Sequence, residues 1–279
     1  MKRYRVLNFD LDSRATILSM EIDESWEEKV KEQHLRNKKQ TEEQLLIEFG
    51  SSNKESKIKN FCDLGNSPFS ILAFHNKFLH QIRNSFVLSS YYPALTGACS
   101  LGERILNHLI IQLRNDFKNT PEYKKVHRKD SFDDWGLAIK TLSSWKILLP
   151  DVVKNYEKLE KIRHREAIHF NPATDTNDRE IALRAIKTLQ IIIQKQFGAF
   201  GLQPWFIKGI KGASYIKKEY ENYPFIKKIY LPNCVLVGPL HRLEFVNGEW
   251  KVIDNNTYYD REIFDREFVE LLEKRKTGK

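Results

Sequence analysis

The feature that most constrains this chain is a stretch from about residue 67 to residue 197 in which apolar residues recur at helical spacing. Apolar positions three or four residues apart predict an amphipathic helix. The predicted helices cover residues 69–89, 92–117, 135–145, 151–170 and 178–197. Because the connections between them are short, they are typical of a bundle of four or five helices.

Local signals mark the ends of several of these helices. Ser67-Pro68 is typical of an N-cap followed by proline at the first helical position. Asn171-Pro172 is expected to end the fourth helix, because proline disfavours the helical conformation in the residue before it.

Short β-type patterns flank the predicted bundle. Residues 7–11 alternate in polarity, residues 15–22 form a second extended candidate, and Asp12-Ser13-Arg14 has turn chemistry, which together predict a β-hairpin. Residues 24–49 predict a charged helix. Near the other end, residues 228–237 and 241–254 read as strands. Asn247-Gly248 is a strong hairpin signal within the second of them, and a short helix follows.

The expected architecture is therefore mainly α, and α+β overall. An N-terminal piece (residues 1–66) and a C-terminal piece (residues 200–279) each contain β structure and flank the helical bundle (residues 67–199). The pattern leaves open that the two β-containing pieces share one sheet.

Composition narrows the class of protein. An apolar fraction of 41% with 12% aromatic residues suffices for a core, so a globally disordered chain is excluded. No apolar run approaches the ~20 residues of a membrane-spanning helix, and a secretory signal is not expected.

The cysteines Cys62, Cys99 and Cys234 form no Cys-x-x-Cys pair, so we expect reduced thiols in a cytoplasmic protein. The motifs for metal or cofactor binding are missing, and we expect neither.

The charge is the first indication of a partner. Forty-six Lys and Arg residues against 37 Asp and Glu residues leave a formal charge of +9. Such an excess favours polyanionic partners, nucleic acid before a membrane surface. An ordinary mixed charged surface explains the same excess, so both interpretations stay open.

The most informative stretch is residues 162–172. On an α-helix, Arg163 falls on the same face as Val152, Tyr156 and Leu159. An arginine on an apolar face must extend to solvent, pair, or line a cleft. His169 lies near the expected end of this helix, where the helix dipole favours a protonated imidazole.

Arg163 and His169 enclose five residues, and the polar His164 directly follows the arginine. This arrangement resembles the Arg-x4–6-His motif of the HEPN superfamily (higher eukaryotes and prokaryotes nucleotide-binding), over roughly residues 67–199. The resemblance implies a bundle of four or five helices and a metal-independent endoribonuclease that acts as a homodimer. It also implies a toxin or antiviral-defence role, with an antitoxin or another regulatory partner as restraint.

The residue types suit ribonuclease chemistry. A histidine that titrates near neutral pH can act as general acid or base, and an arginine can stabilise a phosphate that gains charge. By the resemblance, His169 is the acid/base, Arg163 holds the phosphate and His164 assists. Glu103, on an earlier helix, could hold Arg163 or His169, or be an ordinary surface group. Arg165 could contact a backbone phosphate or be solvated.

Two other interpretations stay open for this motif. The arginine and the histidines could only cap carbonyls and pair with acids. Alternatively, the domain could be a non-catalytic HEPN-like module that binds nucleotides or a partner protein.

A second candidate for RNA binding lies between Trp205 and Tyr230, where lysines alternate with aromatic residues. Lysines that neutralise phosphates beside rings that stack on bases would suit single-stranded RNA. The alternative is a connector that packs its rings inward and leaves its lysines outside. The lysines singled out are Lys208, Lys211, Lys217 and Lys218.

Overall fold

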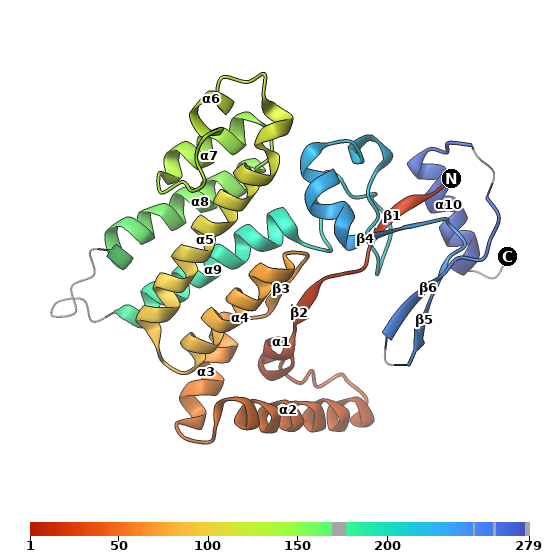
Figure 1. The fold of residues 1–279 in the computed structure, drawn as a ribbon. Coiled ribbons are helices and arrows are strands. Elements are labelled where there is room, and N and C mark those ends of the chain that lie inside the picture. Colours follow the sequence, from red (N-terminus) through yellow and green to blue (C-terminus); the bar gives the residue numbers. More distant parts are fainter. Residues whose placement is uncertain (169–176, 248, 259–260, 277–279) are drawn as a thin grey trace. The chain divides into compact units, whose positions relative to one another are not determined.

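The computed structural model describes residues 1–168, 177–247, 249–258 and 261–276 and divides the chain into two compact units (Figure 1). The helical unit comprises Asp10–Gly198. The terminal unit combines Met1–Phe9 with Ala199–Lys279. The boundary near residue 199 matches the expected one. Residues 10–66, in contrast, belong with the bundle and do not form a separate piece.

The helical unit confirms the mainly α class, with small β pieces. Its strands are β2 (Asp10–Asp12) and β3 (Ser67–Ser70). Its α-helices are α1 (Arg14–Ser19), α2 (Glu28–Phe49), α3 (Lys54–Leu64), α4 (Ala73–Val87), α5 (Tyr91–Leu113), α6 (Tyr123–Val126), α7 (Trp135–Ser144), α8 (Pro150–Ile162) and α9 (Asp178–Phe197). A 3-10 turn (Arg114–Phe117) follows α5, and a π-helical segment (Arg163–Ile168) follows α8.

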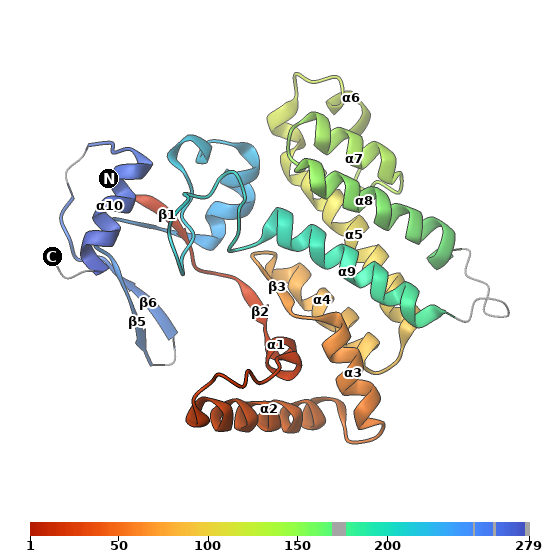
Figure 2. The same ribbon diagram turned by 180° about the vertical axis from the view of Figure 1, so that it is seen from behind.

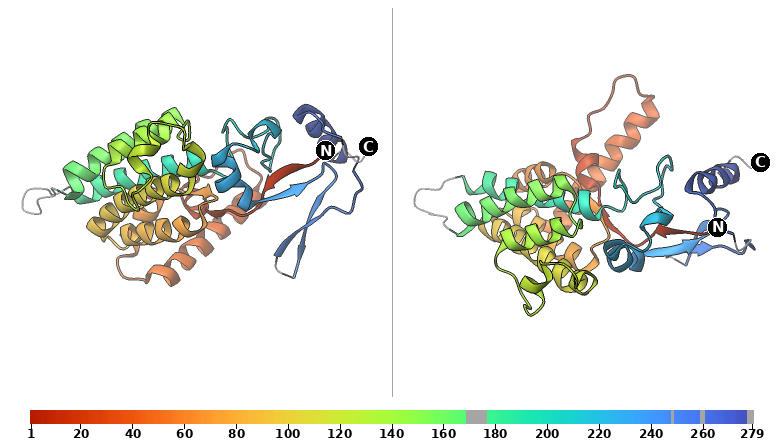
Figure 3. Two further views of the ribbon diagram at one scale, coloured as in Figure 1. Left: turned by 45° about the horizontal axis from the view of Figure 1, so that its top comes forward. Right: turned by 90° about the horizontal axis from the view of Figure 1, so that it is seen from above.

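Helix α5 is the centre of the bundle and packs against α4, α7, α8 and α9 (Figures 1 and 2). Helices α8 and α9 lie side by side, green and teal in Figure 3. Nearly half of the residues of α5 are buried, at positions that recur every three or four residues. Burial of this apolar stripe is what holds the helices together.

The bundle requires glycine at one position of α5. A Cβ atom on Gly102 would lie 2.8 Å from Cδ2 of Leu159 and 3.0 Å from Cη2 of Trp135. Both neighbours are buried and cannot move without disturbing the core. This close approach sets the distance of α5 from α7 and α8.

We expect Gly102→Ala to destabilise the protein by about 1–2 kcal/mol. Overpacking costs about 1–3 kcal/mol, and the better helix propensity of alanine returns up to about 1 kcal/mol. Gly136→Ala on α7 is the matched control, since its Cβ would meet nothing closer than 3.4 Å. Urea unfolding of both variants is the measurement. A Gly102 variant as stable as the Gly136 variant would contradict the expected clash.

The structure corrects the N-terminal prediction. Residues 15–22 do not form a strand, because Arg14–Ser19 is the helix α1. Strand β2 pairs instead with β3, antiparallel, with Asp12 opposite Ser67. Ser67-Pro68 therefore belongs to a strand and is not a helix N-cap. Proline is tolerated in so short a sheet, where few backbone N–H groups need partners. Helix α3 lies where no element was expected.

In the terminal unit, strands from opposite ends of the chain pair. β1 (Arg3–Val6) is antiparallel to β4 (Cys234–Val237), so the two β-containing pieces do share a sheet. The expected strand over residues 228–237 is shortened, because residues 226–233 form π-helical and 3-10 turns. The hydrophobic core of the terminal unit consists of Ile207, Tyr215, Val237, Ile263, Phe268 and Leu272.

The expected hairpin is confirmed. β5 (Arg242–Val246) pairs with β6 (Glu249–Ile253), and Val246 lies opposite Glu249. Asn247 has φ 54°, the left-handed conformation that a tight hairpin turn requires. Helix α10 (Asp265–Lys276) follows. Among the described residues, no helix is both long and apolar enough to cross a membrane.

Candidate functional site

An open groove with a volume of about 670 Å³ follows α5 in the helical unit. Because residues three and four apart share a helix face, one side of α5 forms its floor. The π-helical segment contributes Arg163, Ala167 and Ile168, and the loop before α7 contributes Asp130 and Ser131. The lining residues from α5 are Tyr92, Thr96, Cys99, Ser100, Glu103, Arg104, Asn107, His108 and Ile111.

Two of the expected site residues meet in this groove. Nε of Arg163 lies 3.1 Å from Oε2 of Glu103. The same carboxylate oxygen accepts a hydrogen bond of 2.9 Å from Nε1 of Trp135. The guanidinium group lies over the Trp135 ring, 5.7 Å from its centroid. Arg163 and Glu103 each keep 27% of their side-chain surface exposed, so the pair forms part of an open wall and is not enclosed in the core.

The backbone explains why Arg163 leaves the apolar face on which it falls in a helical projection. Val152, Tyr156 and Leu159 are fully buried, as that projection predicts. The α-helix ends at Ile162, and residues 163–168 are π-helical. A π-helix, with hydrogen bonds between residues five apart, rotates less per residue than an α-helix, whose bonds join residues four apart. From Arg163 onward the side chains therefore point in other directions than the α-helical projection predicts. Isolated π-helical turns occur frequently at functional sites.

The other residues of the motif are placed differently. His164 and Arg165 are exposed on the π-helical segment and do not line the groove. Glu166, on the same segment, forms an ion pair with Arg184 of α9. His169 lies outside the described residues. The described structure therefore brings Arg163 and Glu103 together in the groove, whereas His164 is exposed and is not part of the groove lining.

The charges in the groove are balanced. Arg104 and Arg163 face Glu103 and Asp130, so the described groove attracts anions at particular points and is not basic throughout. The guanidinium group of Arg104 lies 4.8 Å from the centroid of the Phe78 ring. No ion pair of Arg104 is found among the residues that the structure describes. Within the described residues, Arg104 is therefore a cation of the groove that no carboxylate neutralises.

Neutral groups complete the groove. Burial, together with the positive charge of Arg104, lowers the pKa of His108. Burial raises the pKa of the Cys99 thiol to about 12, which makes it a poor nucleophile at neutral pH. The side chain of Asn107 donates to the carbonyl of Phe132 at 2.9 Å and accepts from its N–H at 2.5 Å. These two hydrogen bonds to the backbone of Phe132 hold the loop that carries Asp130 and Ser131.

His75 of α4 lies behind His108, with the ring centroids 5.0 Å apart. Burial, the neighbouring His108 and the charge of Arg104 lower its pKa to about 4. Within the described parts of the chain, its buried Nε2 has no hydrogen-bond partner. The folded state therefore holds this imidazole neutral at a pH where the unfolded chain, with a pKa of about 6.5, already binds a proton.

We expect stability to decrease as the pH falls from about 6.5 to 4, because the unfolded state binds more protons in that window. The contribution of His75 is about 2 kcal/mol, less than its full pKa shift implies, since the ring is only partly buried. His75→Phe should flatten the profile of unfolding free energy against pH in that range. His80→Phe, an exposed position on the same helix, is the control. Equal flattening by both variants would refute the assignment to His75.

Most of the aromatic rings of residues 205–230 are buried and cannot stack on RNA bases, whereas Tyr223 is 55% exposed and Tyr220 is partly exposed. Trp205, Phe206, Tyr215, Phe225 and Tyr230 are buried in the terminal unit. Several pack against one another, with Trp205 5.4 Å from Phe225 and 5.3 Å from Tyr230 between ring centroids. This is the inward packing of the alternative interpretation, because rings of this size gain most from leaving water.

The four lysines themselves lie near the surface. Lys208 and Lys217 line one hollow together with the acidic residues Asp265 and Glu270. Nζ of Lys217 donates to the carbonyl of Pro204 at 2.6 Å. Lys218 pairs with Glu221 at 2.9 Å and with Glu262 at 3.3 Å. Lys211 is exposed. Acidic partners thus neutralise part of this charge.

Sequence reasoning missed two residues that shape the groove. Arg104 and His108 are four residues apart, so helical spacing places them on one face of α5 beside Glu103. That signal was available. The contact of Trp135 with Glu103 joins residues 32 positions apart, and no local pattern predicts it.

Comparison with known proteins identified no relative of this chain. No protein-family model matches the chain, and no curated protein sequence or solved structure is significantly similar to it. Within the described residues, no group of three or more His, Cys, Asp or Glu side chains is arranged to hold a metal ion.

Proposed function

We propose that this chain is a metal-independent endoribonuclease of the HEPN type. The observation that carries the proposal is the position of Arg163, held by Glu103 and Trp135 in the wall of an open groove and partly exposed there. An arginine enclosed in the core could not reach the phosphate of a substrate, so its exposure in the groove is what the proposal requires. RNA as substrate, a homodimer as active form, a cytoplasmic toxin or antiviral role and an antitoxin as restraint come from the resemblance of the motif.

The chemistry needs only side chains of this kind. The ribose 2′-oxygen attacks the adjacent phosphorus and loses its proton to a base. The bond to the 5′-oxygen breaks, and that oxygen takes up a proton. The products carry a 2′,3′-cyclic phosphate and a 5′-OH. His169, by the resemblance, transfers the protons.

Arg163 would stabilise the charge on the phosphate oxygens. Nε of its guanidinium group forms the ion pair with Glu103, and 27% of the side chain remains exposed in the groove, where its N–H groups could donate to a phosphate. Glu103 and Trp135 would hold the guanidinium plane in one orientation, which favours contacts to two phosphate oxygens at once.

The second candidate is a HEPN-like module that binds nucleotides without cleaving RNA. The balanced charge of the groove favours it, because Glu103 already neutralises part of the charge of Arg163. A short ligand with one or two phosphates needs less positive surface than a long polyanion does.

The test is incubation of the full chain with unstructured RNA and with tRNA in EDTA. The ribonuclease proposal predicts fragments that end in a 2′,3′-cyclic phosphate and a 5′-OH. It also predicts no cleavage by His169→Ala that is folded by circular dichroism. Cleavage only with added Mg²⁺, or equal cleavage by the variant, would overturn it. A wild-type protein that binds nucleotides but leaves both RNAs intact would favour the second candidate.

A further inference from the structure

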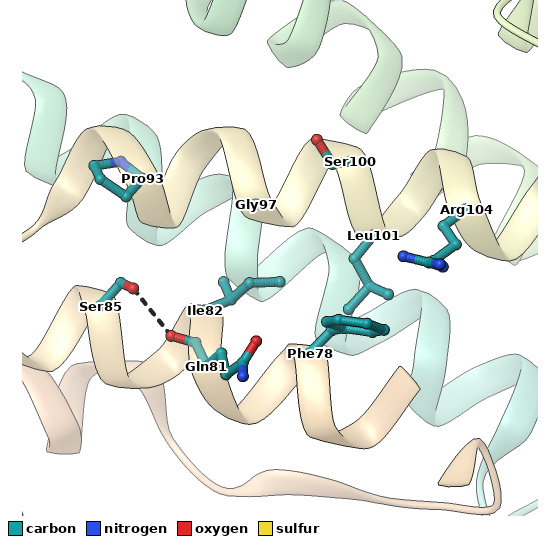
Figure 4. A pocket seen from close by; sticks show the side chains of 9 residues that line it. All are labelled: Phe78, Gln81, Ile82, Ser85, Pro93, Gly97, Ser100, Leu101 and Arg104. Atoms are coloured by element: carbon teal, nitrogen blue, oxygen red, sulfur yellow. Dashed lines mark hydrogen bonds between the residues drawn. The ribbon is translucent and has the colours of Figure 1, made fainter. Parts of the chain in front are cut away.

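A second pocket, with a volume of about 280 Å³, lies between α4 and α5 (Figure 4). Helix α4 contributes Phe78, Gln81, Ile82 and Ser85, and helix α5 contributes Pro93, Gly97, Ser100, Leu101 and Arg104. Figure 4 shows the side chains of Phe78 and Leu101 between the two helices, with the guanidinium group of Arg104 at one end. The volume is near the lower end of the range for small-molecule sites, which suits one ring system.

This pocket adjoins the groove that contains Arg163. Ser100 and Arg104 line both of them, because they lie on the ridge of α5 that separates the two hollows. A ligand whose phosphate contacts Arg104 from the groove therefore has its neighbouring group within reach of the pocket. In RNA, each phosphate is bonded to a ribose that carries a base, so the group that could enter the pocket is the base.

The lining has the chemistry of a base site. Planar bases stack on aromatic rings and on arginine guanidinium planes. Here the Arg104 guanidinium lies 4.8 Å from the centroid of the Phe78 ring, so the two planar groups stand at the same end of the pocket. Ile82 and Leu101 are buried apolar walls. A largely apolar pocket with few polar groups is typical of ligand sites.

Gln81 supplies the polar recognition. It is an exposed residue at the mouth of the pocket, and its amide carries two donors and one acceptor. The neighbouring hydroxyl of Ser85 donates to the backbone carbonyl of Gln81 at 3.0 Å, so it can accept but is not free to donate elsewhere. Hydrogen bonds to the edge of a base are what distinguish one base from another.

We propose that the pocket between α4 and α5 binds one nucleobase next to a phosphate that Arg104 contacts, and that Gln81 determines which base is preferred. The inference rests on the proposed function in one respect only, namely that the ligand of the groove is RNA. It assigns base selection to residues outside the Arg-x4–6-His motif.

The experiment measures binding of the full chain to fluorescein-labelled 2′-O-methyl oligonucleotides, one homopolymer for each base, by fluorescence anisotropy. These probes lack the 2′-hydroxyl nucleophile, so binding is measured without cleavage. The wild type is expected to prefer one base. Gln81→Ala should weaken binding of the preferred homopolymer by about fivefold, the effect of one hydrogen bond, and leave the other three within twofold. Gln44→Ala, an exposed glutamine on α2, is the matched control and should change nothing.

Arg104→Ala provides the second variant. Loss of its charge-assisted contact should weaken binding of all four homopolymers by about tenfold, with the order of preference unchanged. Equal affinity of the wild type for the four homopolymers would overturn the base pocket, as would a preference that survives Gln81→Ala. Lack of binding to any probe would overturn it too.

These outcomes separate the inference from the proposed function. Cleavage of RNA by a wild type that shows no base preference would retain the ribonuclease and refute the pocket. Preference that depends on Gln81, in a protein that cleaves no RNA, would retain the pocket and refute the ribonuclease. A pocket that no base enters would leave a side chain of a partner protein as the occupant to test next.

Discussion

Replacing Arg163 with alanine is expected to lower the rate of RNA cleavage by about two to three orders of magnitude. The reason is electrostatic: a guanidinium group held in place donates to oxygens that gain negative charge in the transition state, and water cannot replace a donor that is already oriented. The measurement is the single-turnover rate on a labelled RNA in EDTA. Single-turnover conditions separate the chemical step from product release.

The fold should survive this change. Glu103 keeps its hydrogen bond from Trp135 and is partly exposed, so we expect the unfolding free energy to change by less than about 1 kcal/mol. Arg163→Lys keeps the charge but not the planar fork and should lie between wild type and alanine in rate. Arg36→Ala, an exposed arginine on α2, is the control and should stay within twofold of wild type. An Arg163→Ala protein that is folded and cleaves RNA at the wild-type rate would refute a role for the groove in catalysis.

The second large effect concerns the terminal unit. The side chain of Arg3 is 1% exposed, and its Nε donates to Oδ1 of Asp265 at 2.7 Å. NH1 donates to the carbonyl of Lys2 at 2.9 Å, and NH2 donates to the carbonyl of Ile263. The guanidinium group also lies over the Phe268 ring. A strand at the start of the chain is thus joined to the helix near its end.

Asp265→Ala is expected to destabilise the protein by about 3–5 kcal/mol, because it leaves a buried guanidinium charge without a carboxylate. Glu267→Ala on the same helix is the control. Its partner Arg261 is 61% exposed, so that loss should stay below about 1 kcal/mol. Hydrogen exchange of the β1 amides, Arg3–Val6, reports the stability of this unit directly.

A third variant tests the physical reason. The double change Arg3→Met with Asp265→Ala removes both charges and should regain most of the lost stability, since an apolar pair can replace a buried ion pair. If the double variant is as unstable as Asp265→Ala alone, the cost lies in lost packing and not in the unpaired charge.

Local sequence predicted the elements of this protein that depend on periodicity. The runs that became α5, α8 and α9 have apolar residues on one face, and burial of that face is local information. The hairpin at Asn247 was equally local, because few residues adopt the left-handed turn conformation. Local spacing also indicated that Arg163 is a candidate site residue, since a charged residue on an otherwise apolar helix face must extend to solvent, pair or line a cleft.

Contacts between distant segments were beyond local reasoning. Ser67-Pro68 reads as a helix start when taken alone, and it forms a strand because residues 10–12 pair with it. The pairing of β1 with β4 joins residues more than 200 positions apart. Such pairings depend on which distant segments meet in the folded state. The entropic cost of closing the loop between two segments varies only slowly with loop length, so distance along the sequence does not predict the partner.

By itself, the sequence determined that the middle of this chain is a helical bundle with a few small β pieces around it, and that Arg163 must extend to solvent, form a pair or line a cleft. Only the tertiary structure decided that Glu103 and Trp135 hold this arginine in an open groove beside Arg104. The physical reason is that helix faces follow from a repeat of three to four residues, whereas a site forms from side chains that packing brings together from separate helices.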